Sequence, residues 1–141
     1  VDPSSVVVSE EKKEPLETSV FDVQSSVVID ESVLNDLKAI LGDDYLLLID
    51  AFFSDADSII DAFNKMIEKG DMSDYTSVSQ LSHSLKSISQ NVGAMTLSSM
   101  AAQLELESRQ DDVPKLQAKL GALIVMYQNV KNELQRIVAG L

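Results

Sequence analysis

Residues 44–69 read DYLLLIDAFFSDADSIIDAFNKMIEK, and this stretch decides the fold class. Its apolar residues recur at alternating steps of three and four, which places them on one stripe of an α-helix. The stripe comprises Tyr45, Leu48, Phe52, Ala56, Ile59, Phe63 and Met66. Gly70 follows directly and predicts the end of the helix. Because such a stripe is not stable in water, it predicts other helices that cover it.

Two segments on either side of this helix carry similar signals. A short helix is predicted over residues 31–41, with Asp30 as its N-cap and Gly42 as its end. Another helix is predicted from about Ser73 to Asn91, with Gly93 just beyond it. Its apolar stripe comprises Val78, Leu81, Leu85, Ile88 and Val92.

The last third of the chain predicts two more helices. Thr96 is a good cap for the fourth, and the fifth begins near Asp112, with Pro114 tolerated in its first turn. The stripe of the fifth comprises Leu116, Leu120, Leu123, Tyr127, Val130, Leu134 and Ile137. Together these signals predict an all-α fold: an antiparallel four-helix bundle with a short additional N-terminal helix. This domain is expected over residues 29–141, after an acidic, flexible linker or tail over residues 1–28.

The composition argues against several classes of function. The chain has 11 Lys and Arg against 23 Asp and Glu, a formal net charge of -12. Binding to nucleic acid or to an anionic membrane needs clustered basic residues, so neither partner is expected. No apolar run approaches the roughly 20 residues of a membrane span. The sequence contains no cysteine, which excludes disulfides and thiolate metal sites and fits a reducing compartment.

His83 is the only histidine and the main candidate for chemistry. At about 100° per residue, it lies roughly 170° from the centre of its helix's apolar stripe, so it is expected to face solvent. Ser79, Lys86, Ser87 and Gln90 fall on the same face. The plain interpretation is a solvated helix surface that happens to carry a histidine. Metal binding is disfavoured, because one imidazole without cysteines makes a poor transition-metal site.

Residues 83–94, HSLKSISQNVGA, resemble the signature of histidine-phosphotransfer domains. That signature is a His, a Lys three residues later, small residues, then an apolar residue and Gly. The resemblance extends over roughly residues 29 to 138, and the Leu104-Glu105 pair also fits it. It implies that His83 accepts a phosphoryl group from a receiver-domain aspartate and passes it to a response regulator.

The resemblance also implies roles for the neighbours of His83. Lys86 could lower the cost of the phosphoryl charge, and Gln90 could donate a hydrogen bond to it. Ser87 departs from the family, which usually has Gly there to leave room beside the phosphorylated ring. The Ser87 side chain would either crowd the phosphoryl group or hydrogen-bond to it, and the sequence leaves both open.

The implied protein is a phosphocarrier rather than an enzyme, with no cofactor of its own. Magnesium is expected on the partner receiver domain, and the sequence shows no nucleotide-binding loop. We expect a cytoplasmic monomer, and a hybrid sensor kinase as the parent protein stays open. The alternative function is a non-phosphorylated helical adaptor that docks a receiver-like or helical partner. An enzyme acting alone is disfavoured, because no pocket signature is visible.

A second apolar set on the helix over residues 44–69 suggests a docking surface. It comprises Leu46, Phe53, Ile60 and Ile67, which recur at every seventh residue on the flank of the main stripe. Packing inside the bundle is one explanation. The functional explanation predicts that at least one of Phe53 and Ile60 is substantially accessible, within reach of a partner bound over His83.

Overall fold

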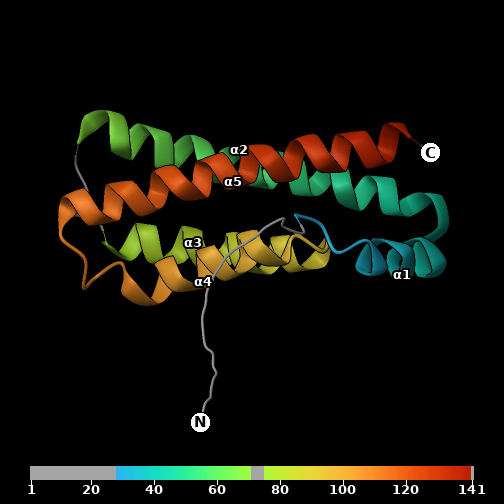
Figure 1. Cartoon of the computed structure of the whole chain (residues 1–141), viewed down its shortest axis with the longest axis horizontal. Helices are drawn as coiled ribbons and strands as arrows, with labels where there is room; N and C mark the ends of the chain where they lie inside the picture. The colour runs from blue at the N-terminus through green and yellow to red at the C-terminus, as the bar shows by residue number, and fades with distance from the viewer. Residues whose placement is uncertain (1–27, 71–74, 141) are drawn as a thin grey trace, which may run out of the picture.

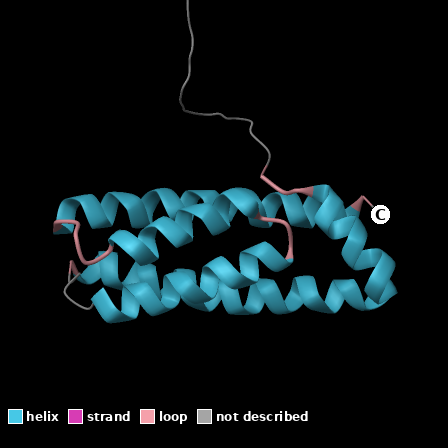
Figure 2. Cartoon of the chain, turned by 90° about the horizontal axis from the view of Figure 1, so that it is seen from below, coloured by secondary structure: helices cyan, strands magenta, loops and turns pink. Residues whose placement is uncertain are grey.

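The computed structural model describes residues 28–70 and 75–140, and helices make up its regular structure (Figures 1 and 2). In order these are α1 (Glu31–Leu41), the 3-10 turn η1 (Gly42–Asp44), α2 (Tyr45–Lys69), α3 (Tyr75–Asn91), α4 (Met95–Glu107) and α5 (Val113–Ala139). The described residues contain no strand, so the predicted all-α class is confirmed. The tail expected over residues 1–28 lies almost wholly outside them, as does the helix start expected at Ser73.

The helices pack along one another, and α3 packs most extensively on α4 (Figure 1). These two helices run in opposite directions, as two pairs of contacts along them show. The Ser98 hydroxyl donates to the Lys86 carbonyl near one end, and Arg109 donates to the Thr76 hydroxyl near the other. α2 and α5 contact each other and complete the core, while α1 packs on η1 and the start of α2. Within the described parts of the chain, no helix is both long enough and apolar enough to cross a bilayer.

Capping residues and glycines in the sequence predicted most of the observed helix ends correctly. The Asp30 carboxylate accepts a hydrogen bond from the Ser32 backbone N–H at 3.0 Å and caps α1. The Asp112 carboxylate caps α5 in the same way, through the Lys115 N–H at 2.9 Å. α2 ends at Gly70, whose φ of 70° lies in the left-handed region. These three boundaries agree with the sequence because caps and left-handed glycines act within a few residues.

The predicted cap of the fourth helix was wrong. α4 begins at Met95, so Thr96 lies inside its first turn instead of preceding it. The Ser98 N–H already donates to the Ala94 carbonyl at 3.0 Å, which makes Ala94 the cap residue. The cause is the tight turn at Gly93, with a φ of 78°, which lets α4 start sooner than a threonine cap would.

The core follows the predicted stripes of α2 and α5 closely, but that of α3 only in part. α5 buries its predicted stripe apart from Ile137, which is partly exposed. On α3, Ser82 and Ser89 are fully buried, whereas Leu81 and Ile88 are only partly buried. The buried face of α3 is therefore rotated toward α4 relative to the apolar stripe. Small side chains let two helix backbones approach closely, and close approach buries a serine as effectively as a leucine.

Candidate functional site

His83 lies near the middle of α3 and points to solvent. About 60% of its side chain is exposed, as its position opposite the apolar stripe predicts. Val78 and Leu85, on the other side of the helix, are completely buried and fix the rotation of α3 against the core. The imidazole is therefore accessible to a partner protein while the backbone that carries it is anchored.

One ring nitrogen of His83 is engaged by a carboxylate from the neighbouring helix. Nδ1 lies 2.9 Å from Glu105 Oε2, and Glu105 comes from α4, which packs antiparallel to α3. A carboxylate can only accept, so Nδ1 is the donor and carries the proton. In the neutral form of the imidazole, the lone pair is then on the other nitrogen, Nε2.

Glu105 also binds Lys86. Lys86 Nζ donates to Glu105 Oε1 at 3.2 Å, so the two carboxylate oxygens serve one partner each. Partial burial acts to raise the pKa of the Glu105 carboxyl, but the hydrogen bonds from Lys86 and His83 and the electrostatic attraction to these side chains outweigh it and hold the pKa below its usual value. Glu105 is therefore ionised at neutral pH, and the three side chains form one charged cluster, named here the His83–Glu105–Lys86 cluster.

Glu105 is the site residue that sequence reasoning missed. The Leu104-Glu105 pair matched the family pattern, but nothing in the sequence gave this glutamate a role. Glu105 and Glu107 lie two residues apart on α4, and Glu107 binds Lys119 on α5 instead of a residue on α3. Two residues turn a helix by about 200°, so the two carboxylates face opposite flanks. Only the packing of α4 shows which of them reaches His83.

The other predicted site residues are near His83 but make no hydrogen bond to its imidazole ring. Gln90 is exposed two turns further along α3 and does not belong to the His83–Glu105–Lys86 cluster. Ser87 is exposed one turn along, and its hydroxyl donates to the His83 backbone carbonyl at 3.3 Å. Ser79 lies one turn before His83 on α3 and is partly buried. The structure therefore brings His83 and Lys86 together through Glu105, whereas Ser87 and Gln90 lie outside the His83–Glu105–Lys86 cluster.

The hydrogen bond of the Ser87 hydroxyl favours one of the two roles that the sequence left open. A hydroxyl that already donates to the backbone is less available to a phosphoryl group, so crowding is the expected effect of its side chain. Ser87→Gly should therefore raise the phosphoryl-transfer rate a few-fold without changing partner affinity. The helix should lose no more than about 1 kcal/mol, because glycine has a lower helix propensity. Stopped-flow transfer kinetics and thermal melts measure both effects, and slower transfer in the variant would contradict the crowding account.

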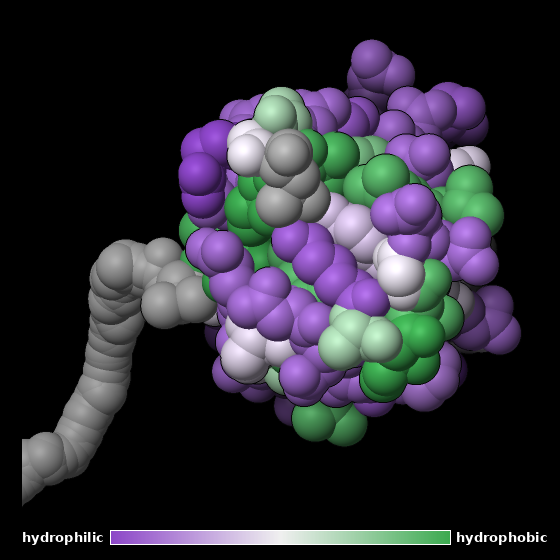
Figure 3. All heavy atoms as spheres, turned by 90° about the vertical axis from the view of Figure 1, so that its right-hand side faces the viewer, coloured by the Kyte–Doolittle hydropathy of each residue, from purple (hydrophilic) through white to green (hydrophobic). Residues whose placement is uncertain are grey.

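The accessibility predicted for Phe53 and Ile60 is absent at Ile60 and only partial at Phe53. Ile60 is only 5% exposed, and Phe53 is partly buried against the core, with Lys131 Nζ of α5 lying 5.8 Å from its ring centroid. These side chains turn toward α5, whereas His83 turns toward α4, because the flank of α2 is used in helix packing. Exposed large apolar side chains lie where α1 meets α2, at Ile40, Leu41, Leu46 and Leu47, of which Leu46 belongs to the predicted set. Others lie on α4 and α5, at Met95, Leu106, Val113 and Val125. Figure 3 views the molecule from the end where α1 meets α2 and shows apolar patches among polar ones.

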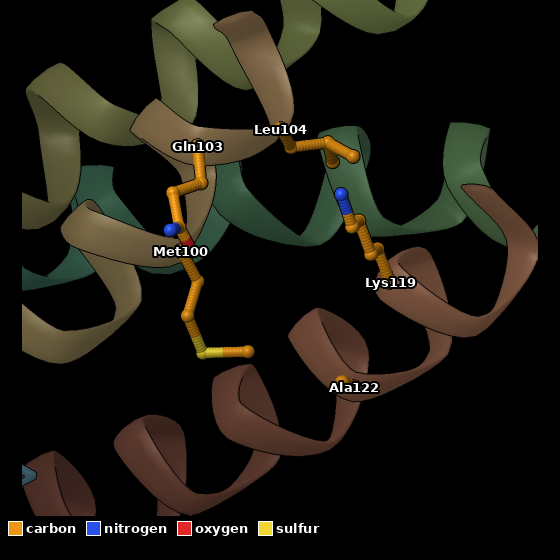
Figure 4. A pocket seen from close by; sticks show the side chains of 5 residues that line it. All are labelled: Met100, Gln103, Leu104, Lys119 and Ala122. Carbon is orange, nitrogen blue, oxygen red and sulfur yellow. The ribbon is translucent and has the colours of Figure 1, made fainter. Parts of the chain in front are cut away.

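A small hollow between α4 and α5 is separate from the site. It has a volume of about 100 Å³ and is lined by Met100, Gln103, Leu104, Lys119 and Ala122 (Figure 4). Lys119 is held at its edge by ion pairs to Glu107 and Asp111. His83 is not among the lining residues of this hollow, and its imidazole lies on an exposed part of the surface.

Comparison with known proteins identifies a family and a similar solved structure. The sequence pattern of the family described as Hpt domain matches residues 47–140. The fold resembles the crystal structure of histidine-containing phosphotransfer protein B (HptB) from Pseudomonas aeruginosa PAO1, with a TM-score of 0.60 and 26% sequence identity. That alignment covers 79% of this chain and 98% of the other. No curated relative matches at a significant level.

Proposed function

This chain belongs to the Hpt domain family, and from that membership we propose that His83 is the phosphoacceptor of a His–Asp phosphorelay. In this proposal a receiver-domain aspartyl phosphate donates the group to His83, and His83 passes it to the aspartate of a response regulator. The observation that carries the proposal is an accessible imidazole with one nitrogen held by a carboxylate and the other open to solvent. An adaptor without phosphotransfer would have no use for that arrangement.

Nε2 is the nucleophile in this proposal. Its lone pair attacks the phosphorus in line with the aspartyl oxygen, the P–O bond breaks, and its electron pair stays on the aspartate as a carboxylate. Lys86 is close enough to the ring to offset the negative charge of the phosphoryl group, because both side chains bind the same carboxylate. Magnesium and the acidic pocket are assigned to the receiver, and this chain acts as a carrier without its own ATP site.

The finer expectations about the protein rest on the same membership. We propose response-regulator receiver domains as the partners, a monomeric state and a cytoplasmic location. We also propose that α2 to α5 serve as an antiparallel four-helix bundle whose rigidity holds His83 ready for attack. The opposite course of α3 and α4 and the buried side chains behind His83 support this last proposal.

The site makes a prediction about which nitrogen is phosphorylated. Incubation with a phosphorylated receiver domain, or with a small-molecule phosphodonor, should give acid-labile, base-stable phosphate on this chain. The product should be the Nε2 isomer of phosphohistidine, because Nδ1 is covered by Glu105. ³¹P and ¹⁵N NMR of the labelled protein distinguish the two isomers. A product phosphorylated on Nδ1 would contradict the assigned nucleophile, and no incorporation at all would contradict the phosphocarrier function.

A further inference from the structure

Three serines are buried where α3 packs on α4, and they differ in what their hydroxyls bind. Ser82 and Ser89 of α3 are fully buried, and neither hydroxyl has a hydrogen-bond partner within the described parts of the chain. Ser98 of α4 is 3% exposed, and its hydroxyl donates to the Lys86 backbone carbonyl at 3.1 Å. Of the three, Ser98 alone therefore joins the two helices by a hydrogen bond, and burial shields that bond from competing water.

This hydrogen bond lies next to the His83–Glu105–Lys86 cluster. In an α-helix the carbonyl points toward the C-terminus, whereas the side chain leans toward the N-terminus. Lys86 therefore presents its carbonyl to Ser98 and sends its side chain back along α3 to Glu105. Ser98 and Glu105 are seven residues apart on α4, which leaves only about 20° of rotation between them, so both face α3 (Figure 1). α4 thus contacts the same residue of α3 through its backbone and through its side chain.

The two contacts differ in how firmly they can hold one helix against the other. The Lys86 and Glu105 side chains are long and are 29% and 25% exposed, and an ion pair of this kind holds its partners only weakly. The Ser98 hydroxyl is short and buried, and it binds a backbone atom that α3 itself keeps in place. The buried serines of α3 are small, so they resist sliding of α4 less than large side chains do. The Ser98 hydrogen bond is therefore well placed to fix how far along α3 the residues of α4 lie.

We propose that Ser98 is a positioning residue for phosphoryl transfer: its hydroxyl fixes the axial register of α4 on α3, so that Glu105 meets Lys86 and His83 at hydrogen-bonding distance. This inference rests on the proposed function and deepens it, because it assigns the geometry of the charged cluster to a buried contact. The Ser98 hydroxyl binds the backbone and not the imidazole. Hydrogen bonds of 2.9 and 3.2 Å weaken steeply when their partners separate by roughly 0.5 Å, so a small slip of α4 is enough to disturb the cluster.

The kinetic test removes one hydroxyl at a time from this interface. Ser98→Ala breaks the bond to Lys86, whereas Ser82→Ala and Ser89→Ala remove hydroxyls that bind nothing in the described parts of the chain. At saturating phosphorylated receiver, Ser98→Ala should take up phosphate about fivefold more slowly, the loss expected for one buried hydrogen bond. The receiver concentration that gives half the maximal rate should stay unchanged, because Ser98 is buried away from the surface that a partner covers. The two control variants should match the wild-type chain.

¹³C NMR of the unphosphorylated chain supplies a readout that a loss of stability alone does not move. The pKa of the Glu105 carboxyl reflects partial burial, which raises it, and the hydrogen bonds from Lys86 and His83, which lower it more strongly. If α4 slips, both hydrogen bonds lengthen, so the pKa of Glu105 should rise toward its usual value in Ser98→Ala. In the two control variants it should stay where it is in the wild-type chain. Far-ultraviolet circular dichroism checks that all variants are folded at the temperature of the assays.

Three results would overturn the role of Ser98 and leave the phosphocarrier function intact. The first is a Glu105 pKa in Ser98→Ala equal to that of the wild-type chain, because the cluster would then keep its geometry without the hydroxyl. The second is uptake by Ser98→Ala at the wild-type rate. The third is equal slowing in Ser89→Ala, which would trace the effect to packing and not to the hydrogen bond. A wild-type chain that takes up no phosphate would instead overturn the proposed function and this role together.

Discussion

Replacing His83 by Gln is expected to abolish phosphate uptake completely. His83 is the only imidazole in the sequence, and in the proposed function its Nε2 is the nucleophile that attacks the phosphoryl group. The Gln amide has no comparable lone pair on nitrogen, so attack on the aspartyl phosphate should stop. Uptake is measured with a ³²P-labelled receiver domain, followed by electrophoresis of the alkali-treated protein.

The same variant should leave the fold unchanged, because the His83 side chain is mostly exposed and, among the described residues, its ring is hydrogen-bonded to Glu105 alone. Far-ultraviolet circular dichroism and the melting temperature provide the control. The loss expected from an ion pair this exposed is no more than about 1 kcal/mol. Labelling of the Gln variant to the wild-type level would show that the phosphoryl group is carried elsewhere.

Replacing Gly93 by Ala is expected to have the largest effect on stability. Gly93 has a φ of 78°, and a Cβ there would lie 2.6 Å from the Asp30 carbonyl oxygen and 3.2 Å from Val33 Cβ. The Gly93 carbonyl also accepts a hydrogen bond from the Asp30 N–H at 2.8 Å, which fastens the start of α1 to the α3–α4 turn. Backbone strain and the displaced contact should together cost about 2–4 kcal/mol of the free energy of unfolding.

Two other glycines serve as matched controls for this prediction. Gly70 also has a positive φ, 70°, but a Cβ there meets nothing within 4 Å, so Gly70→Ala should cost only about 1–2 kcal/mol. Gly121 lies inside α5, also with open space around it, and Gly121→Ala should stabilise the chain by up to about 1 kcal/mol. Urea unfolding ranks the three variants. A cost for Gly93→Ala no larger than that for Gly70→Ala would refute the close contact with α1.

Much of the fold could be predicted because its signals are local. The Asp30 and Asp112 caps and the Gly70 stop act within one helical turn, and they appear where the sequence predicts them. The apolar stripe of α5 is regular enough to identify its buried face. Thr96 shows the limit of this reasoning, because it is a good cap residue but does not cap α4. The turn at Gly93 sets the start of α4 instead, and it is held against Asp30, which lies 63 positions earlier in the sequence.

The burial of Ile60 and the partial burial of Phe53 have a related physical reason. The seventh-residue repeat of Phe53 and Ile60 identifies a second apolar flank on α2, but a flank is exposed only if no neighbour covers it. In the structure α5 lies along that side, and Lys131 lies over the Phe53 ring. The sequence of α2 contains the periodicity of its apolar residues but no information about which neighbouring helix occupies each side.

By itself the sequence determined the helical class, the main helix ends and the solvent exposure of His83, because these follow from the spacing of residues along one helix. Only the tertiary structure decided that Glu105, 22 positions after His83, forms a hydrogen bond with Nδ1 of His83 and that Glu107 binds Lys119 instead. It also decided that serines of α3 are buried where α4 approaches. Such contacts depend on the rotation and distance between two packed helices. That arrangement is a compromise among all the core side chains together, so no single stretch of sequence specifies it.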